Sequence, residues 1–376
     1  MTVRKHGTKG AADKKIALFV SSFEAGGVQR IMVNLANELW DSGYIVQFVA
    51  VTNRGPLIKL INPQISVKHL DSKRVLFSLK ELIKFFKSEK IDVFVSGQTH
   101  LNAIAIIAQK LAGNSSQMIV TEHNHMSSVV REGRNWVNRL RPLWAKLLYH
   151  FADDVVTVSA GVADDLSKVS GIRREKIKVV FNPAIDETLF RDKDLPVNHP
   201  WFQDTGSPIV LGVGRLAAQK DFSNLIQAIR IANEERPIRL IILGEGQERK
   251  NLEGLVDALN LSELVSLPGN VENPFAYMKN ADLFVLSSAW EGLSTVLIEA
   301  MACGTSVVST DCPSGPREIL EDGKYGMLVP VGDAEALAEG ILKVLANPSE
   351  ADELRERAHH FLSSEAVKNY TELFND

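Results

Sequence analysis

Cysteine is scarce in this sequence, and its spacing fits neither a disulfide framework nor a zinc site. The chain of 376 residues has 2 cysteines, Cys303 and Cys312, and no Cys-x-x-Cys pair. We therefore expect neither a disulfide scaffold nor a structural zinc ion, and a reducing cytoplasm is the better fit.

Long apolar runs are absent too. No run has the length of a membrane-spanning helix, and the first apolar segment, 16–21, is too short for a signal peptide. Residues 1–13, which are basic and polar, are expected to form a disordered leader. These absences favour a cytoplasmic protein.

Two further signatures are missing. The dinucleotide fingerprint G-x-G-x-x-G does not occur, which gives a dehydrogenase little support. His123 and His125 are one residue apart, but no carboxylate or cysteine stands at ligand spacing from them. Asp192 and Asp194 form an Asp-x-Asp within a polar segment rather than after an apolar strand. A metal site is therefore not expected.

Charge is divided unequally along the chain, although the formal net charge is only -4. Residues 1–190 carry 26 Lys and Arg against 17 Asp and Glu, a balance of +9, whereas the remainder carries 16 against 29, a balance of -13. The basic first half suggests an anionic partner for that half, and a chance difference between the halves is the alternative.

Short apolar segments alternate with segments of helical periodicity, which predicts an α/β protein with doubly wound parallel sheets. In the first half we expect strands at 15–21, 44–51, 93–97, 118–121, 152–159 and 176–181, and helices at 29–39, 76–90, 99–112 and 160–168. The polar, proline-containing stretch 186–203 has no periodicity and is interpreted as the region of a linker.

A second series of strands and helices begins after that stretch. Strands are expected at 208–214, 240–243, 265–267, 281–287 and 306–309, and helices at 223–233, 252–259, 274–279 and 294–303. The predicted organisation is an N-terminal domain at 14–190, a linker at 191–204, a C-terminal domain at 205–354 and an amphipathic C-terminal segment at 355–376.

The stretch 281–309 carries two carboxylates in unusual places. Glu291 lies in the turn before a predicted helix, and Glu299 lies eight residues later, inside that otherwise apolar helix. The start of a helix offers unpaired N–H groups and a partial positive charge, which attract anions such as phosphate. Carboxylates on both sides of an anion site suit the hydroxyl groups of a sugar nucleotide, in which a diphosphate separates a sugar from a ribose.

Two segments of the first half combine positive charge with apolar residues. The segment 76–90 carries Lys80, Lys84 and Lys87. The segment 131–149 carries Arg134, Arg139, Arg141 and Lys146. Such helices are typical of proteins that lie on an anionic membrane, but ordinary surface helices packed on a sheet fit the pattern equally well. Nucleic acid is not an expected partner, because the second half is acidic and no recognised binding motif is present.

Several motifs occur together and in order, and on these the chain resembles glycosyltransferase family 4, a family of retaining enzymes. The resemblance covers 16–374 and rests on Gly26-Gly27 with Gln29-Arg30, His123 in the run TEHN, Asn182-Pro183, Gly214-Arg215 with Lys220, Gly244-Glu245-Gly246, and Glu291 with Glu299. It implies the GT-B architecture, two Rossmann-like doubly wound domains facing a cleft, with the C-terminal segment crossing back to the first domain. The proline that the family often has near Ser294 is missing.

The resemblance also implies roles for individual residues. Arg215 and Lys220 neutralise the donor diphosphate, Glu291 binds the donor sugar, and Glu299 binds the ribose. The implied catalytic set is His123, Glu291, Arg215 and Lys220. The implied donor-binding set is Gly26, Gly27, Arg215, Lys220, Gly244, Asn270, Val271, Glu291, Gly292, Leu293, Ser294, Thr295, Val296 and Glu299.

The activity that the resemblance implies is transfer of a hexose or N-acetylhexosamine from an NDP-sugar, above all UDP-GlcNAc or UDP-GalNAc, to a glycan hydroxyl with retention. A polyprenyl-diphosphate-linked acceptor and a peripheral position on the inner face of the cytoplasmic membrane are expected, with no metal or other cofactor. A UDP-GlcNAc 2-epimerase-like isomerase and a non-catalytic NDP-sugar binder are the alternatives. The spacing of Glu291 and Glu299 argues against the isomerase.

Overall fold

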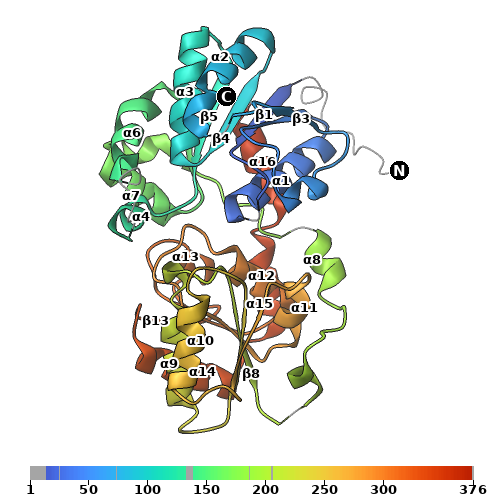
Figure 1. Ribbon diagram of the computed structural model, residues 1–376, viewed down its shortest axis with the longest axis vertical. Coiled ribbons are helices and arrows are strands. Elements are labelled where there is room, and N and C mark those ends of the chain that lie inside the picture. Colours follow the sequence, from blue (N-terminus) through green and yellow to red (C-terminus); the bar gives the residue numbers. More distant parts are fainter. Residues whose placement is uncertain are drawn as a thin grey trace. The chain divides into compact units, whose positions relative to one another are not determined.

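The chain forms two compact units, one of which is inserted into the other along the sequence. The computed structural model describes residues 14–24, 26–72, 74–132, 139–185, 187–204 and 206–374, so the predicted leader at 1–13 lies outside the described residues. Unit 1 comprises Met1–Pro183 and Ser363–Asp376, and unit 2 comprises Ala184–Leu362 (Figure 1).

Unit 1 is built on a 7-stranded parallel sheet with the order β3-β2-β1-β4-β5-β6-β7. The strands are β1 (Lys15–Val20), β2 (Ile45–Ala50), β3 (Ser66–His69), β4 (Val93–Gly97), β5 (Gln117–Glu122), β6 (Asp154–Thr157) and β7 (Ile177–Val179). The central strands are apolar and buried, as expected for a parallel sheet with helices on both faces. The edge strand β3 is short and half exposed, and its sequence, SVKH, gave no strand signal.

The helices of unit 1 largely follow the predicted periodicity. They are α1 (Gly27–Asp41), α2 (Leu79–Ser88), α3 (Thr99–Ala112), α4 (Met126–Glu132), α6 (Arg141–Leu148), α7 (Ala160–Ser170) and α16 (Ser363–Leu373), with the 3-10 turns η1 (Pro56–Leu60), η2 (Val75–Ser78), η3 (Tyr149–Phe151) and η4 (Arg174–Lys176). The segment predicted as one helix at 76–90 is a 3-10 turn followed by the shorter α2. None of the helices in the described ranges is long and apolar enough to cross a bilayer.

The last helix of the chain completes the core of unit 1. Val367, Tyr370, Leu373 and Phe374 are buried in the same cluster as residues of β1 and α1. The ring of Phe374 meets that of Tyr44 edge to face, with 5.8 Å between centroids. A hydrogen bond also ties the backbone of α16 to β5: the Nε2 of Gln117 donates to the carbonyl of Leu373 at 2.7 Å.

Unit 2 has a 6-stranded parallel sheet with the order β10-β9-β8-β11-β12-β13. Its strands are β8 (Ile209–Val213), β9 (Arg239–Leu243), β10 (Val265–Gly269), β11 (Leu283–Leu286), β12 (Val307–Thr310) and β13 (Met327–Val329). Its helices are α8 (Glu187–Asp192), α9 (Phe222–Ala232), α10 (Arg249–Ala258), α11 (Pro274–Asn280), α12 (Thr295–Cys303), α13 (Pro316–Ile319), α14 (Ala334–Ala346) and α15 (Ala351–His359), with the 3-10 turns η5 (Pro200–Gln203) and η6 (Ala218–Lys220).

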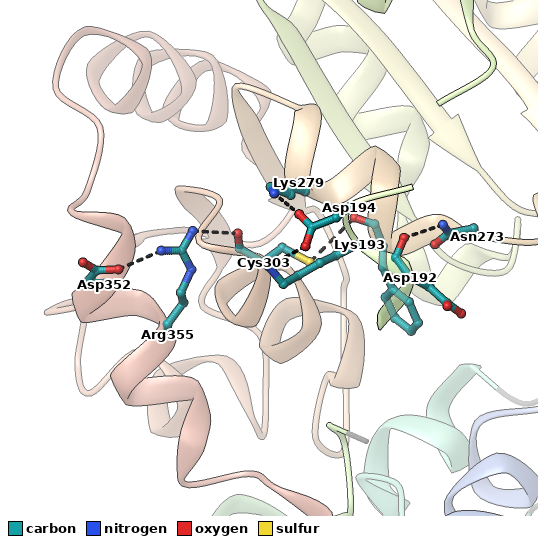
Figure 2. A network of polar contacts seen from close by, with 9 residues as sticks. Asp192, Lys193, Asp194, Asn273, Lys279, Cys303, Asp352 and Arg355 are labelled. Atoms are coloured by element: carbon teal, nitrogen blue, oxygen red, sulfur yellow. Dashed lines mark hydrogen bonds and ion pairs between the residues drawn. The ribbon is translucent and has the colours of Figure 1, made fainter. Parts of the chain in front are cut away.

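The segment predicted as a linker at 191–204 is packed onto unit 2. Figure 2 shows how polar contacts hold it: the side-chain amide of Asn273 donates to the carbonyl of Asp192 at 2.7 Å, and Lys279 pairs with Asp194. Nearby, Arg355 of α15 donates to the carbonyl of Cys303 at 3.4 Å, which joins α15 to the end of α12 (Figure 2). The charged residues and prolines of this segment suggested a flexible connection. In the structure, charged side chains of the segment form ion pairs, as Asp194 does with Lys279.

The predicted C-terminal segment 355–376 is two helices rather than one. The first, α15, belongs to unit 2, and the second, α16, belongs to unit 1. The chain turns between them at 360–362, where Phe361 is buried.

Candidate functional site

Each sheet has one point at which the strand order reverses. In unit 2 it lies between β8 and β11, and in unit 1 between β1 and β4. The loops that leave the carboxyl ends of two such strands diverge to opposite faces of the sheet, and ligands of doubly wound folds bind in the crevice between them. In unit 2 these loops are 214–221 and 287–294, which contain Arg215, Lys220 and Glu291.

Glycines let the loops of unit 2 pack backbone against backbone. A Cβ atom added to Gly244 would lie 1.9 Å from the carbonyl oxygen of Gly214, and one added to Gly246 would lie 2.1 Å from that of Leu216. Gly244 also has a φ of 137°, which disfavours any other residue. The Gly244-Glu245-Gly246 motif thus fixes the course of the loop that carries Arg215.

Lys220 and Glu291, from different loops, form an ion pair at the switch point of unit 2. The Nζ of Lys220 lies 2.6 Å from Oε1 of Glu291, and the hydroxyl of Ser288 donates to the same oxygen at 2.6 Å. The two charged side chains are 16% and 8% exposed. Both hydrogen bonds end on Oε1, and no described residue donates to Oε2. The carboxylate is therefore held in place with one oxygen left to accept from a ligand hydroxyl.

Further hydrogen bonds tie the two loops together around this pair. Ser287 donates from its hydroxyl to the carbonyl of Lys220 at 2.7 Å, and the Nε2 of Gln219 donates to the carbonyl of Trp290 at 3.0 Å. The N–H of Ala289 donates to the carbonyl of Gln219 at 2.8 Å. The ion pair thus sits in a preorganised frame rather than on mobile loops.

Arg215 contrasts with Lys220. Its side chain is exposed, and it has neither a hydrogen bond nor an ion pair with any described residue. A guanidinium group offers several N–H donors in a planar fork that matches the oxygens of a phosphate. Arg215 can therefore bind an anion without giving up a protein partner.

The start of α12 has no side-chain cap. Ser294 occupies the N-cap position, but its hydroxyl accepts no bond from the helix backbone, and Oγ is buried without a hydrogen-bond partner. Gly315 packs directly on this turn, since an added Cβ atom would lie 3.2 Å from the carbonyl oxygen of Gly292 and from Cα of Leu293. Uncapped N–H groups and an unpartnered hydroxyl together suit a phosphate oxygen.

The remaining predicted residues of unit 2 lie at the same carboxyl edge of the sheet or on α12. Glu299 is half-buried, one turn of helix before Cys303. Burial, and after it the charge of Glu299, raise the pKa of the Cys303 thiol to about 12. Asn270 and Val271 directly follow β10, where Asn270 is exposed and Val271 half-buried.

In unit 1, Gly26 and Gly27 lie at the start of α1, beside the switch point. Gly26 is the N-cap, and α1 also begins without a side-chain cap. A Cβ atom added to Gly27 would have no neighbour within 4 Å. Packing among the described residues therefore does not require a glycine at 27, and the open space beside it is accessible to a ligand.

His123 lies directly after β5 and is buried. Its Nε2 is 2.8 Å from the hydroxyl oxygen of Thr121, and that hydroxyl donates to the carbonyl of Ser96 at 3.1 Å. The other ring nitrogen, Nδ1, is buried without a hydrogen-bond partner among the described residues. Burial lowers the pKa of His123 to about 4, although the nearby Asn182 acts in the other direction. The imidazole is thus neutral at neutral pH.

Glu122, the residue before His123, is a buried carboxylate that was not among the predicted site residues. Glu122 accepts hydrogen bonds from the hydroxyl of Tyr149, from that of Thr99 at 3.1 Å and from the amide of Asn102 at 3.3 Å. Burial raises the pKa of Glu122, and these hydrogen bonds oppose the rise. Its sequence signal was an acidic residue at the end of an otherwise apolar strand.

The chain matches known glycosyltransferases along almost its whole length. The model of "Glycosyltransferase Family 4" matches residues 25–187, and that of "Glycosyl transferases group 1" matches residues 199–361. The N-acetylgalactosamine-N,N'-diacetylbacillosaminyl-diphospho-undecaprenol 4-alpha-N-acetylgalactosaminyltransferase of Campylobacter jejuni is 30% identical, with 91% of this chain and 92% of that protein covered. The lipopolysaccharide core biosynthesis glycosyltransferase LpsE of Rhizobium meliloti is 29% identical, with 90% and 91% covered.

Solved structures agree on the fold. The Anabaena protein Alr3699/HepE, solved in complex with UDP and glucose, superposes with a TM-score of 0.81 at 20% identity, over 96% of this chain and 99% of that one. The predicted pair of doubly wound domains of GT-B type is confirmed. The motifs, the two sheets and the extent of the matches lead to one conclusion: the chain belongs to glycosyltransferase family 4.

Proposed function

We propose that this glycosyltransferase moves an N-acetylhexosamine or hexose from a UDP-sugar, with retention, to a hydroxyl of a lipid-linked glycan in surface-polysaccharide or glycoconjugate synthesis. The observation that carries the proposal is the Lys220–Glu291 pair, with a Nζ–Oε1 distance of 2.6 Å, at the switch point of unit 2. The name of the Campylobacter jejuni relative, which describes an N-acetylgalactosamine transferase for a diphospho-undecaprenol glycan, supports both donor and acceptor class.

In the proposed complex the donor diphosphate lies at the uncapped start of α12, where the N–H groups of Ser294, Thr295 and Val296 face it. Arg215 and Lys220 add positive charge, and Oε2 of Glu291 accepts a hydroxyl of the donor sugar. The ribose is assigned to Glu299 and the base to the segment that contains Asn270 and Val271. Gly26, Gly27 and His123 of unit 1 are assigned to the diphosphate and the donor sugar.

The proposed chemistry needs fixed positive charge more than a protein nucleophile. Negative charge grows on the diphosphate as the glycosidic bond breaks, and preorganised cations stabilise it. The acceptor oxygen bonds to the anomeric carbon on the face from which the diphosphate departs, and the hydroxyl proton passes to a departing phosphate oxygen. With Arg215 and Lys220 in this role, the reaction requires no metal ion or other cofactor.

An assay of UDP release tests the proposal. UDP- and GDP-sugars are compared with and without a short-chain polyprenyl-diphosphate-linked glycan, and each reaction is repeated in EDTA. We expect release that depends on the acceptor, occurs with UDP-sugars and persists in EDTA. Turnover of UDP-GlcNAc without an acceptor would show the isomerase, and binding of UDP-sugars without release would show the non-catalytic binder. A strict requirement for a divalent metal would contradict the metal-free scheme.

We also propose that unit 1 lies on the inner face of the cytoplasmic membrane. Exposed cations support this, namely Lys80, Lys84, Lys87, Arg139 and Lys146, whereas Arg134 lies outside the described residues. Apolar side chains support it too: Leu143, Leu147 and Phe151, spaced four residues apart on α6 and η3, are 47%, 58% and 53% exposed. An exposed apolar stripe among cations is the pattern of a helix at an anionic lipid surface.

Vesicle co-sedimentation checks this surface. Replacing Lys80, Lys84, Lys87, Arg139 and Lys146 by glutamine should weaken binding to phosphatidylglycerol vesicles, with each cation near the surface contributing about 1 kcal/mol. Leu147→Ser should weaken it further, whereas the matched change Leu195→Ser, in unit 2 and 50% exposed, should not. Unchanged sedimentation of the charge variant would rule the surface out.

A further inference from the structure

Arg141 differs from the cations that are assigned to the membrane surface of unit 1. The lysines of α2, Arg139 and Lys146 are exposed, but Arg141, the first residue of α6, is half-buried. Its Nε is shielded from solvent and has no hydrogen-bond partner, and the guanidinium makes no ion pair with any described residue. A buried N–H donor without an acceptor is destabilising, so such a group indicates a missing partner.

The neighbours of Arg141 lie at the carboxyl edge of β4 and β5. Helix α6 packs on α3, whose first turn contains His100. Burial, and after it the charge of Arg141, lower the pKa of His100 to about 4, so the imidazole is neutral and the guanidinium lies near enough to act on it. The same charge lowers the pKa of Glu122 against the larger effect of burial. Glu122 already accepts from three protein donors and forms no ion pair with Arg141.

Gln98 adds a second unusual feature at this edge. It is the N-cap of α3 with φ 114° and ψ 131°, a conformation that favours glycine, and its side chain makes no capping bond. Residues with side chains in such conformations are strained, and they cluster at functional sites. The side chain is half-buried and has no hydrogen bond to a described residue. A strained glutamine therefore lies two residues before His100, the group whose pKa the charge of Arg141 lowers.

We propose that Arg141, with His100 and Gln98, binds a phosphate group of the glycosyl acceptor. A guanidinium donates two parallel N–H bonds to phosphate oxygens, and a neutral imidazole and an amide each add a donor. The site lies at the switch point of unit 1, at the sheet edge that also carries His123. The inference rests on the proposed function, in which the acceptor sugar is joined to a lipid through a diphosphate.

Two acceptors that share one sugar test the site, one a farnesyl diphosphate glycoside and the other a neutral octyl glycoside. Arg141→Gln should raise KM for the diphosphate acceptor roughly 10- to 100-fold, the effect of losing charge-assisted hydrogen bonds, and leave KM for the neutral one unchanged. The charge-matched control Lys110→Gln, exposed in the last turn of α3, should change neither. In a donor-free titration, farnesyl diphosphate should bind the wild type and lose that binding in Arg141→Gln.

Three outcomes would overturn the assignment. If Arg141→Gln lost activity equally on both acceptors, and the double variant Glu122→Gln/Arg141→Gln restored it, Arg141 would only be a counter-charge for Glu122. Reduced sedimentation with phosphatidylglycerol vesicles, with acceptor discrimination intact, would assign the guanidinium to a lipid headgroup. Failure of the wild type to bind farnesyl diphosphate would refute the site. Because this titration needs no transfer, it is independent of the proposed activity, whose own failure would show as absent UDP release.

Discussion

Arg215→Ala should lower kcat roughly 10²- to 10³-fold, the usual effect of removing one transition-state stabilising group, while the melting temperature stays unchanged. The side chain is exposed and has no partner among the described residues, so its removal breaks no protein contact. Steady-state kinetics with the UDP-sugar donor and thermal unfolding of the same preparation check both halves of the expectation. Arg236→Ala, an exposed arginine elsewhere in unit 2, is the control and should change neither.

Lys220→Ala should lose activity to a similar extent but should also lose stability. Glu291, whose side chain is 8% exposed, would keep only the hydroxyl of Ser288 as a partner. Removing one member of a buried ion pair costs up to about 3–5 kcal/mol, because a charge is left uncompensated. The double variant Lys220→Ala/Glu291→Gln should recover stability without recovering turnover. Wild-type rates in Arg215→Ala or in Lys220→Ala would refute the assignment of the diphosphate site.

Deleting residues 363–376 should unfold unit 1 and spare unit 2. The deletion removes the buried side chains of Val367, Tyr370, Leu373 and Phe374. Each contributes about 1.5–3 kcal/mol by burial, which together is comparable with the roughly 5–15 kcal/mol that holds a whole domain. Calorimetry should show the loss of one unfolding transition, and UDP should still raise the temperature of the transition that remains.

Point variants of α16 show whether the deletion destabilises unit 1 through lost side-chain packing or through the shorter chain itself. Phe374→Ala should destabilise unit 1 by about 3–5 kcal/mol, whereas Lys368→Ala, on the exposed side of α16, should have almost no effect. If the truncated protein kept both transitions, α16 would be an accessory of unit 1 rather than part of its core.

Local sequence signals predicted most of the elements, and the misses have physical causes. Both ends of the helix at 99–112 were predicted correctly. The helix is strongly apolar, and it is followed by Gly113, which takes a left-handed conformation and stops it. Strand β3 was missed because an edge strand needs little apolar surface. The stretch 187–192 was taken for part of a linker because α8 is short and gains its stability from packing on α11 and α12, which no local pattern reveals.

The candidate site was predictable only in part, for a similar reason. Lys220 and Glu291 were each recognised from their motifs, but the bond between them joins positions 71 residues apart and depends on the strand order. The residues around Ser288 and Glu122 in the sequence do not indicate which partners these two side chains bind in the folded protein. The backbone conformation of Gln98 is equally invisible in a list of residues.

The insertion of unit 2 into unit 1 has a consequence for synthesis on the ribosome. Unit 2 is continuous in sequence, from Ala184 to Leu362, and can fold while the chain is still being made. Unit 1 must wait for α16, which is translated after the whole of unit 2, a delay on the order of 10 s at usual rates of elongation. During that interval the surface of β1 and α1 that α16 covers stays open to chaperones and to other nascent chains. The speed of translation through unit 2 therefore sets how long the first half of this enzyme remains vulnerable to aggregation.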